Sequence, residues 1–238
     1  MQKKTYIVFD TETTGLPPKG GYNKPHTDTD NWPRTIQIAW SIYEDHGKLI
    51  KCESHMITPP PDGGFIMEHD TVKFHMRNRG IAIVEDPALT RQQNEAVALL
   101  QLNGLLAEAG KPLSQVLAQF VSDAWSSNVL VAHNINFDTP IIKCEIFRVD
   151  QESDGEWTDL NGESSPIMFP PAKGEPGFSF VCTMLGMQKI FGKWPKLDQL
   201  YHWCFGKGFE NAHDAGGDVT ACADSFFYCV DKGFLKVE

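Results

Sequence analysis

The stretch "YIVFDTETTG", residues 6–15, decides the fold. An uninterrupted apolar run leads directly into two carboxylates, Asp10 and Glu12, and then into Thr-Thr-Gly. A continuous apolar run is typical of a strand that is buried on both faces, so we expect a central strand over residues 5–10. Side chains alternate along a strand, and Asp10 and Glu12 therefore point to the same side at its carboxyl end.

The two acids need a counter-charge or an exposed position. Neighbouring carboxylates repel each other and raise each other's pKa, and a bound divalent cation keeps both ionised. A site built from oxygen ligands favours Mg²⁺ or Mn²⁺ over zinc. The alternative is a strand that simply ends in polar residues at the surface.

The remaining pattern predicts an α/β fold. Residues 35–43 alternate between apolar and polar side chains, and a turn containing Gly47 joins them to a third strand at 49–57, as in an antiparallel hairpin. Helices then alternate with strands. The predicted helices cover 95–110, 111–125, 137–149 with Pro140 in the first turn, 184–191, 197–205 and 215–231, and the later strands cover 128–134 and 178–183.

Composition limits the class of protein. The 238 residues fit one domain spanning 1–238, with two segments, 16–33 and 150–177, that we interpret as insertions. No apolar run approaches the roughly 18 residues of a membrane span. The six cysteines form no C-x-x-C pair, which favours a reducing, cytoplasmic setting. With a net charge of −10, any contact with nucleic acid is expected at a small site where metal ions supply the positive charge.

Two further segments bring acids to the ends of buried elements. "VLVAHNINFD" places Asp138 at the start of a helix, where an acid is also a common cap. "HDAGGDVTACADSFF" contains His213 and Asp218, which one ideal helix would hold about 140° apart. If both serve one site, His213 must come from the loop before the helix; otherwise it is a surface histidine.

Together these residues match the needs of a two-metal phosphodiesterase. The four acids Asp10, Glu12, Asp138 and Asp218 would bind two cations, Mg²⁺ or Mn²⁺, roughly 3.5–4 Å apart. His213, with an ordinary pKa near 6.5, would take the proton of the attacking water. The segments "FDTETTG", "AHNINFD" and "HDAGGD" resemble the three motifs of the DEDDh 3′→5′ exonucleases, the group of the DNA polymerase III epsilon proofreading subunit.

This resemblance implies a ribonuclease H-like fold, with a central five-stranded mixed sheet flanked by helices. Three antiparallel N-terminal strands and two parallel strands make up that sheet. It also implies digestion of single-stranded DNA or RNA from the 3′ end, and a possible DNA polymerase partner. Thr13 and Thr14 align with residues near the terminal 3′-hydroxyl, although turn formation before Gly15 explains them equally well.

The chain departs from the family in two places. Residues 16–33 form a longer link than many relatives have, in which Tyr22 and Trp32 either stack on a base or pack the loop onto the domain. Arg79 stands where relatives often carry a histidine, and we expect it to contact the substrate, as a grip on a phosphate. Open alternatives are an RNA-trimming enzyme, a hydrolase of small phosphodiesters and a non-catalytic docking module.

Overall fold

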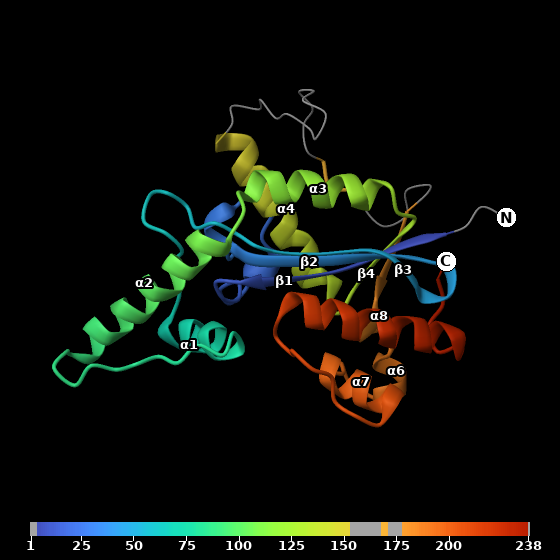
Figure 1. Cartoon of the computed structure of the whole chain (residues 1–238). Coiled ribbons are helices and arrows are strands. Elements are labelled where there is room, and N and C mark those ends of the chain that lie inside the picture. The colour runs from blue at the N-terminus through green and yellow to red at the C-terminus, as the bar shows by residue number, and fades with distance from the viewer. Residues whose placement is uncertain (1–3, 153–167, 171–177, 238) are drawn as a thin grey trace.

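The computed structural model describes residues 4–152, 168–170 and 178–237, and its centre is a five-stranded mixed sheet. The strand order is β3-β2-β1-β4-β5 (Figure 1). β1, β2 and β3 pair antiparallel, and β4 and β5 add in parallel beside β1. The predicted fold class is confirmed. The strands span Thr5–Thr13, Thr35–Glu44, Lys48–Met56, Val129–Ala132 and Ser179–Cys182.

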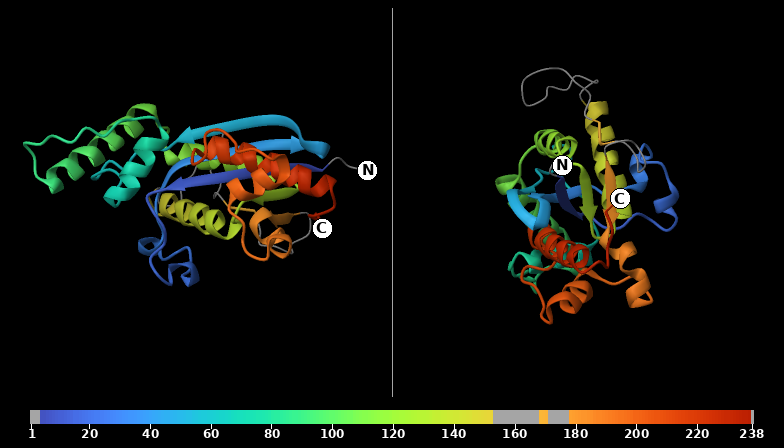
Figure 2. Two further views of the ribbon diagram at one scale, coloured as in Figure 1. Left: turned by 90° about the horizontal axis from the view of Figure 1, so that it is seen from below. Right: turned by 90° about the vertical axis from the view of Figure 1, so that its right-hand side faces the viewer.

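Helices cover both faces of this sheet. In Figure 1, α3 and α4 lie on one face, α8 lies on the other with α7 outside it, and α1 and α2 extend beyond one end, as Figure 2 also shows. The helices α1 to α8 span, in chain order, His69–Asn78, Arg91–Ala109, Leu113–Trp125, Ile135–Glu152, Thr183–Gly186, Gln188–Phe191, Leu197–Phe205 and Ala215–Asp231.

The alternation of side chains along β1 divides the interior into two cores. Ile7 and Phe9 pack in the core that contains α3 and α4, whereas Tyr6 and Val8 pack in the core that contains α7 and α8. Asp10 and Glu12 continue the second series, so they face α8. Thr11 continues the first series and faces α4. The alternation of side chains along β1 thus directs Asp10 and Glu12 toward α8 and Thr11 toward α4.

The turn between β2 and β3 confirms the predicted hairpin. His46 and Gly47 have positive φ values of 63° and 75°. Tight hairpins favour two consecutive residues in this left-handed region because such a turn matches the twist of the strands. On its other edge β2 pairs with β1, and Glu12 of β1 lies opposite Gln37 of β2.

Two sequence expectations were wrong. The sequence analysis assigned no helix to residues 69–78, yet α1 forms there and buries Val72, His75 and Met76. A buried histidine on the inner face and an N-cap without a side-chain bond hid the signal. Pro140 lies inside α4 and not in its first turn, because Asn134 (φ 71°) accepts the Phe137 N–H and starts the helix early.

The two expected insertions differ in what they become. Residues 16–33 contain two 3₁₀ turns, Gly21–Asn23 and Thr29–Asn31, and Trp32 packs with Ile141 and Cys144. In the second segment, residues 150–152 belong to α4, Phe169 packs in the core, and 153–167 and 171–177 lie outside the described residues. None of the described helices has the length and apolar character that crossing a bilayer requires.

Candidate active site

Three of the four motif acids meet in one cluster. Asp10 and Glu12 come from the end of β1, and Asp218 comes from the first turn of α8. One carboxylate oxygen from each lies within 4.8 Å of the other two. Oxygens at this spacing can ligate a single cation, and an all-carboxylate set suits a hard ion such as Mg²⁺ or Mn²⁺.

Asp138 lies beside this cluster. It is 2% exposed, and its Oδ1 accepts hydrogen bonds from the Thr11 backbone N–H (3.1 Å) and hydroxyl (2.7 Å). These bonds hold the carboxylate next to Asp10, and among the charged neighbours of Asp10 it raises that residue's pKa most. The alternative interpretation of Asp138 as a helix cap accounts for neither contact.

Burial and mutual repulsion raise the pKa values of these carboxyl groups by more than the neighbouring protein groups lower them. Burial, followed by the charges of Asp138, Asp218 and Glu12, raises the pKa of Asp10 well above its usual value. Burial raises the pKa of Glu12 to about 8, that of Asp138 to about 7 and that of Asp218 to about 6. A bound divalent cation would reverse these shifts, so the donor set fits the metal site that the sequence predicts.

Arg79 is the nearest basic group. Its guanidinium lowers the pKa of Glu12, although burial outweighs this effect. Nη1 donates to the His75 carbonyl at 3.1 Å and Nη2 donates to Gln37 Oε1 at 3.2 Å. Within the described parts of the chain, no carboxylate lies at ion-pair distance from this guanidinium. Arg79 therefore stands beside the acids without neutralising any one of them.

His213 lies in the loop before α8, where the spacing requires it to be if it shares a site with Asp218. Its φ is 66°, its side chain is exposed, and its backbone N–H donates to Asp218 Oδ1 at 3.3 Å. The imidazole packs against Phe74 of α1, with ring centroids 5.1 Å apart. The ring is thus exposed to solvent near Asp218, whose pKa its charge lowers.

The two threonines shape the turn after β1. The Thr13 hydroxyl donates to the Gly15 carbonyl at 2.7 Å, and the Thr14 hydroxyl accepts from the Arg34 N–H at 3.0 Å. The buried His75 ring donates from Nε2 to the Thr13 carbonyl at 2.9 Å. The backbone of this turn is therefore fixed at the edge of the cluster.

The sequence analysis missed three residues around the site. Gln37, Asp214 and Phe74 contact Arg79, the N-terminus of α8 and His213, respectively. The one available signal was for Asp214, because aspartate before a Gly-Gly helix start is a strong N-cap candidate. Gln37 and Phe74 carry no local signal, since their roles depend on which strands and helices pack together.

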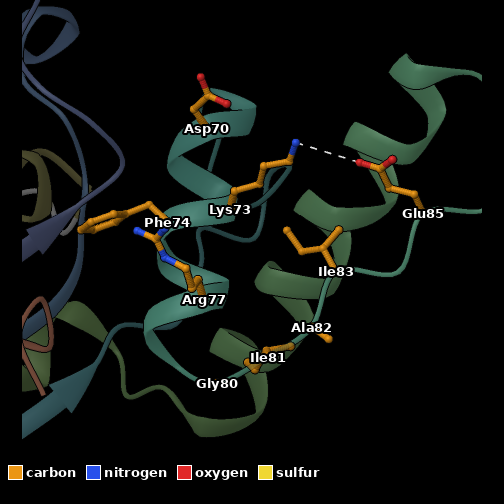
Figure 3. A pocket seen from close by; sticks show the side chains of 9 residues that line it. All are labelled: Asp70, Lys73, Phe74, Arg77, Gly80, Ile81, Ala82, Ile83 and Glu85. Atoms are coloured by element: carbon orange, nitrogen blue, oxygen red, sulfur yellow. Dashed lines mark ion pairs between the residues drawn. The ribbon is translucent and has the colours of Figure 1, made fainter.

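A cavity of about 920 Å³ opens beside Phe74 (Figure 3). α1 forms one wall with Asp70, Lys73, Phe74 and Arg77, and the segment from Gly80 to Glu85 forms the other. Lys73 reaches across the cavity to Glu85 at 4.0 Å. The cavity therefore combines apolar and charged groups, and Phe74 connects it to the ring of His213.

Among known proteins, the chain is similar to solved structures only at the level of the fold. No protein-family profile and no curated protein sequence matches the chain. Among solved structures, an exonuclease I is 16% identical over 96% of this chain, with a TM-score of 0.59. Escherichia coli exonuclease I bound to zinc and single-stranded DNA gives 0.60 at 16% identity over 97% of the chain, and a product-bound exonuclease I gives 0.58 at 16% over 98%.

This chain therefore has the ribonuclease H-like fold of exonuclease I. It corresponds to 41% of the length of the first two of those chains and 45% of the third. At such low identity, the likeness establishes the architecture alone, and the chemistry must be argued from the residues of this chain.

Proposed function

We propose that this protein is a metal-dependent 3′→5′ exonuclease that removes 5′-mononucleotides from single-stranded DNA. The observation that carries the proposal is the cluster of Asp10, Glu12 and Asp218, with Asp138 beside it, on the fold of exonuclease I. Similar exonuclease I structures contain single-stranded DNA and a dT13 oligonucleotide. The resemblance of the three motifs to the epsilon group extends the proposal to proofreading beside a DNA polymerase.

Each residue has a distinct role in this proposal. Asp10, Glu12, Asp138 and Asp218 would hold two Mg²⁺ or Mn²⁺ ions, with Asp10 shared between them. Such ions supply a lowered pKa for the attacking water and charge stabilisation for the leaving 3′-oxygen. The His213 imidazole would accept the proton of that water, since it is exposed and its backbone N–H contacts Asp218 of the cluster.

Residues around the acid cluster would bind the single-stranded DNA. The backbone at Thr13 and Thr14 binds the terminal nucleotide, and Arg79 contributes positive charge near the scissile phosphate. Tyr22 is 51% exposed and its ring lies 6.4 Å from that of Phe137 in α4, the helix that carries Asp138. Burial and then the charge of Asp138 raise the pKa of Tyr22, and we assign its ring to stacking on a base. Lys73 and Arg77 line the cavity wall of α1, and we assign them to the phosphate backbone of the strand.

A 5′-labelled single-stranded oligonucleotide tests this proposal. With Mg²⁺ or Mn²⁺, the wild type is expected to produce a ladder that shortens from the 3′ end, and Asp218→Asn is expected to produce none. Parallel DNA and RNA strands of one sequence separate the DNA exonuclease from an RNA-trimming enzyme. Absence of digestion by the wild type, or equal digestion by Asp218→Asn, would contradict the proposal.

A further inference from the structure

A chain of polar side chains joins Arg79 to the helix that carries Asp218. Gln37 of β2 is 3% exposed and stands at its centre. Its Oε1 accepts from Arg79 Nη2 at 3.2 Å, and its Nε2 donates to Asp214 Oδ2 at 2.8 Å and to Ser54 Oγ at 3.2 Å. The orientation of the amide is set by its partners, because a cation needs the oxygen and a carboxylate needs the N–H.

Asp214 links Gln37 to the N-terminus of α8. Its other oxygen, Oδ1, accepts from the backbone N–H groups of Gly216 and Gly217 at 3.1 and 3.3 Å, which caps the helix. The turn before the cap is tight: Asn211 and His213 both have positive φ, and a Cβ at Gly217 would collide with the Asn211 carbonyl. Side chains other than glycine adopt this region at a cost, so the turn needs support from neighbouring contacts.

We propose that Gln37 is a positioning residue that fixes His213 and Asp218 relative to Asp10 and Glu12. This inference rests on the proposed exonuclease function. Gln37 lies opposite Glu12 in the β1–β2 ladder, and Asp214 directly follows His213 and lies four residues before Asp218. Gln37 belongs to β2, which pairs with the strand that carries two of the acids, and its amide ties this pair of strands to the cap of the helix that carries the third. The same amide holds Arg79 beside Glu12.

A charge exchange tests this role. Gln37→Glu would place two carboxylates face to face, whereas Asp214→Asn would place two amide N–H groups face to face if the amide keeps its bond to Arg79. In the double variant Gln37→Glu/Asp214→Asn, Arg79 faces a carboxylate, the Asn N–H donates to it, and the Asn oxygen still caps the helix. The net charge of the double variant equals that of the wild type.

The expected result is a loss in kcat that the second substitution repairs. Gln37→Glu is expected to lower kcat on labelled single-stranded DNA by about tenfold or more, since small misplacements of catalytic groups can cost up to about 10²-fold. KM should change by less than about threefold, because contacts to the substrate are retained. The double variant should recover kcat to within about threefold of wild type.

Asn103→Asp is a matched control. Asn103 is also an amide that ties two segments, with bonds to the backbone of Phe65 and Leu99, but it lies away from the acids. This variant should lower the melting temperature and leave kcat within about twofold of wild type.

Melting temperatures measured on the same proteins separate the possible failures. If the wild type digests nothing, the proposed exonuclease function fails, and the melting temperatures of the two single variants and the double variant still show whether Gln37 and Asp214 are coupled. If the wild type digests and the double variant regains its melting temperature but not its kcat, the contacts are structural only and the positioning role is overturned. Gln37→Glu with unchanged kcat would overturn it as well.

Discussion

Two acidic regions of this molecule, one fully buried and one partly buried, differ in how their carboxylates are paired. Glu145 of α4 is fully buried, and Arg34 Nε lies 3.2 Å from both of its oxygens. Arg148 Nη1 lies 3.2 Å from Oε1, and the Thr35 N–H donates to the same oxygen at 2.6 Å. Among the described residues, no arginine or lysine forms an ion pair with Asp10, Glu12 or Asp218, and Arg79 near them donates to His75 and Gln37 instead.

The difference shows what each region is for. A buried carboxylate is tolerated when it is paired and hydrogen-bonded, and Glu145 meets both conditions while tying α4 to the start of β2. The acids at the end of β1 meet neither condition, and their raised pKa values record the cost. Two arginines pair with Glu145, whereas no arginine among the described residues forms an ion pair with the acid cluster. We therefore infer that bound cations neutralise the cluster.

The largest expected effect comes from breaking the unpaired cluster. Asp10→Asn removes the acid shared by both proposed cation sites, and should lower kcat by about 10³-fold or more, the scale of losing an essential catalytic group. Because this variant also removes a carboxyl group whose ionised form burial and the neighbouring acids disfavour, its melting temperature without metal should equal or exceed that of wild type. Single-turnover digestion and metal-free thermal melts check both parts; a lower metal-free melting temperature would contradict the comparison.

The paired acid should respond in the opposite sense. Glu145→Gln leaves two partly buried arginines without the buried carboxylate that they share, and breaking a buried pair typically costs about 3–5 kcal/mol of stability. The kcat of the molecules that remain folded should stay near that of wild type, since Glu145 does not belong to the acid cluster. Urea unfolding and digestion at low temperature measure the two quantities. A large loss of kcat with unchanged unfolding would reverse the assigned roles.

The pH dependence of stability sharpens the comparison. Without metal, the folded protein keeps protons on Glu12, with a pKa of about 8, and on Asp138, with a pKa of about 7, at pH values where the unfolded chain has lost them. The folded state then binds more protons than the unfolded state, so stability falls as pH rises.

The window that tests this effect is pH 6.5 to 8. Burial lowers the pKa of His75 and His133 to about 4, and these neutral rings make stability rise with pH only up to the ordinary histidine value of 6.5. Thermal melts in EDTA should therefore show a decrease from pH 6.5 to 8, and saturating Mg²⁺ should remove it. Melts in EDTA that rise across this window would contradict the assigned protonation.

The smallest expected effect lies at the edge of the cluster. Tyr22→Ala removes a half-exposed ring that Trp32 supports edge-on at 6.3 Å. Loss of one stacked base costs about 1–3 kcal/mol, so KM for single-stranded DNA should rise about fivefold or more while kcat changes little. Trp32 is not a suitable control, because it is buried in the domain. An unchanged KM would remove Tyr22 from the strand's path.

The sequence predicted the frame of this molecule and most of its candidate site, for physical reasons. The continuous apolar run of β1 and the alternating pattern of β2 predicted these two strands, and the alternation of side chains along a strand predicted that Asp10 and Glu12 share one side. The packing of α8 against that side is known from the structure. The sequence could not predict the side-chain networks. Gln37 is an ordinary polar strand residue in the sequence, and its partners Arg79 and Asp214 lie at the ends of α1 and α8, which contact it only in the fold. Helix α1 was missed because His75, a polar residue by type, occupies its buried face.

Calorimetric titration with Mn²⁺ tests the central claim most directly. The account predicts that the wild type binds two ions per chain and that His213→Ala binds them with similar affinity, since the imidazole is not a ligand. Asp10→Asn should lose at least one ion, whereas Glu145→Gln, kept folded at low temperature, should bind both. Absence of Mn²⁺ binding by the wild type, or undiminished binding by Asp10→Asn, would contradict the claim that the unpaired acids form a cation site.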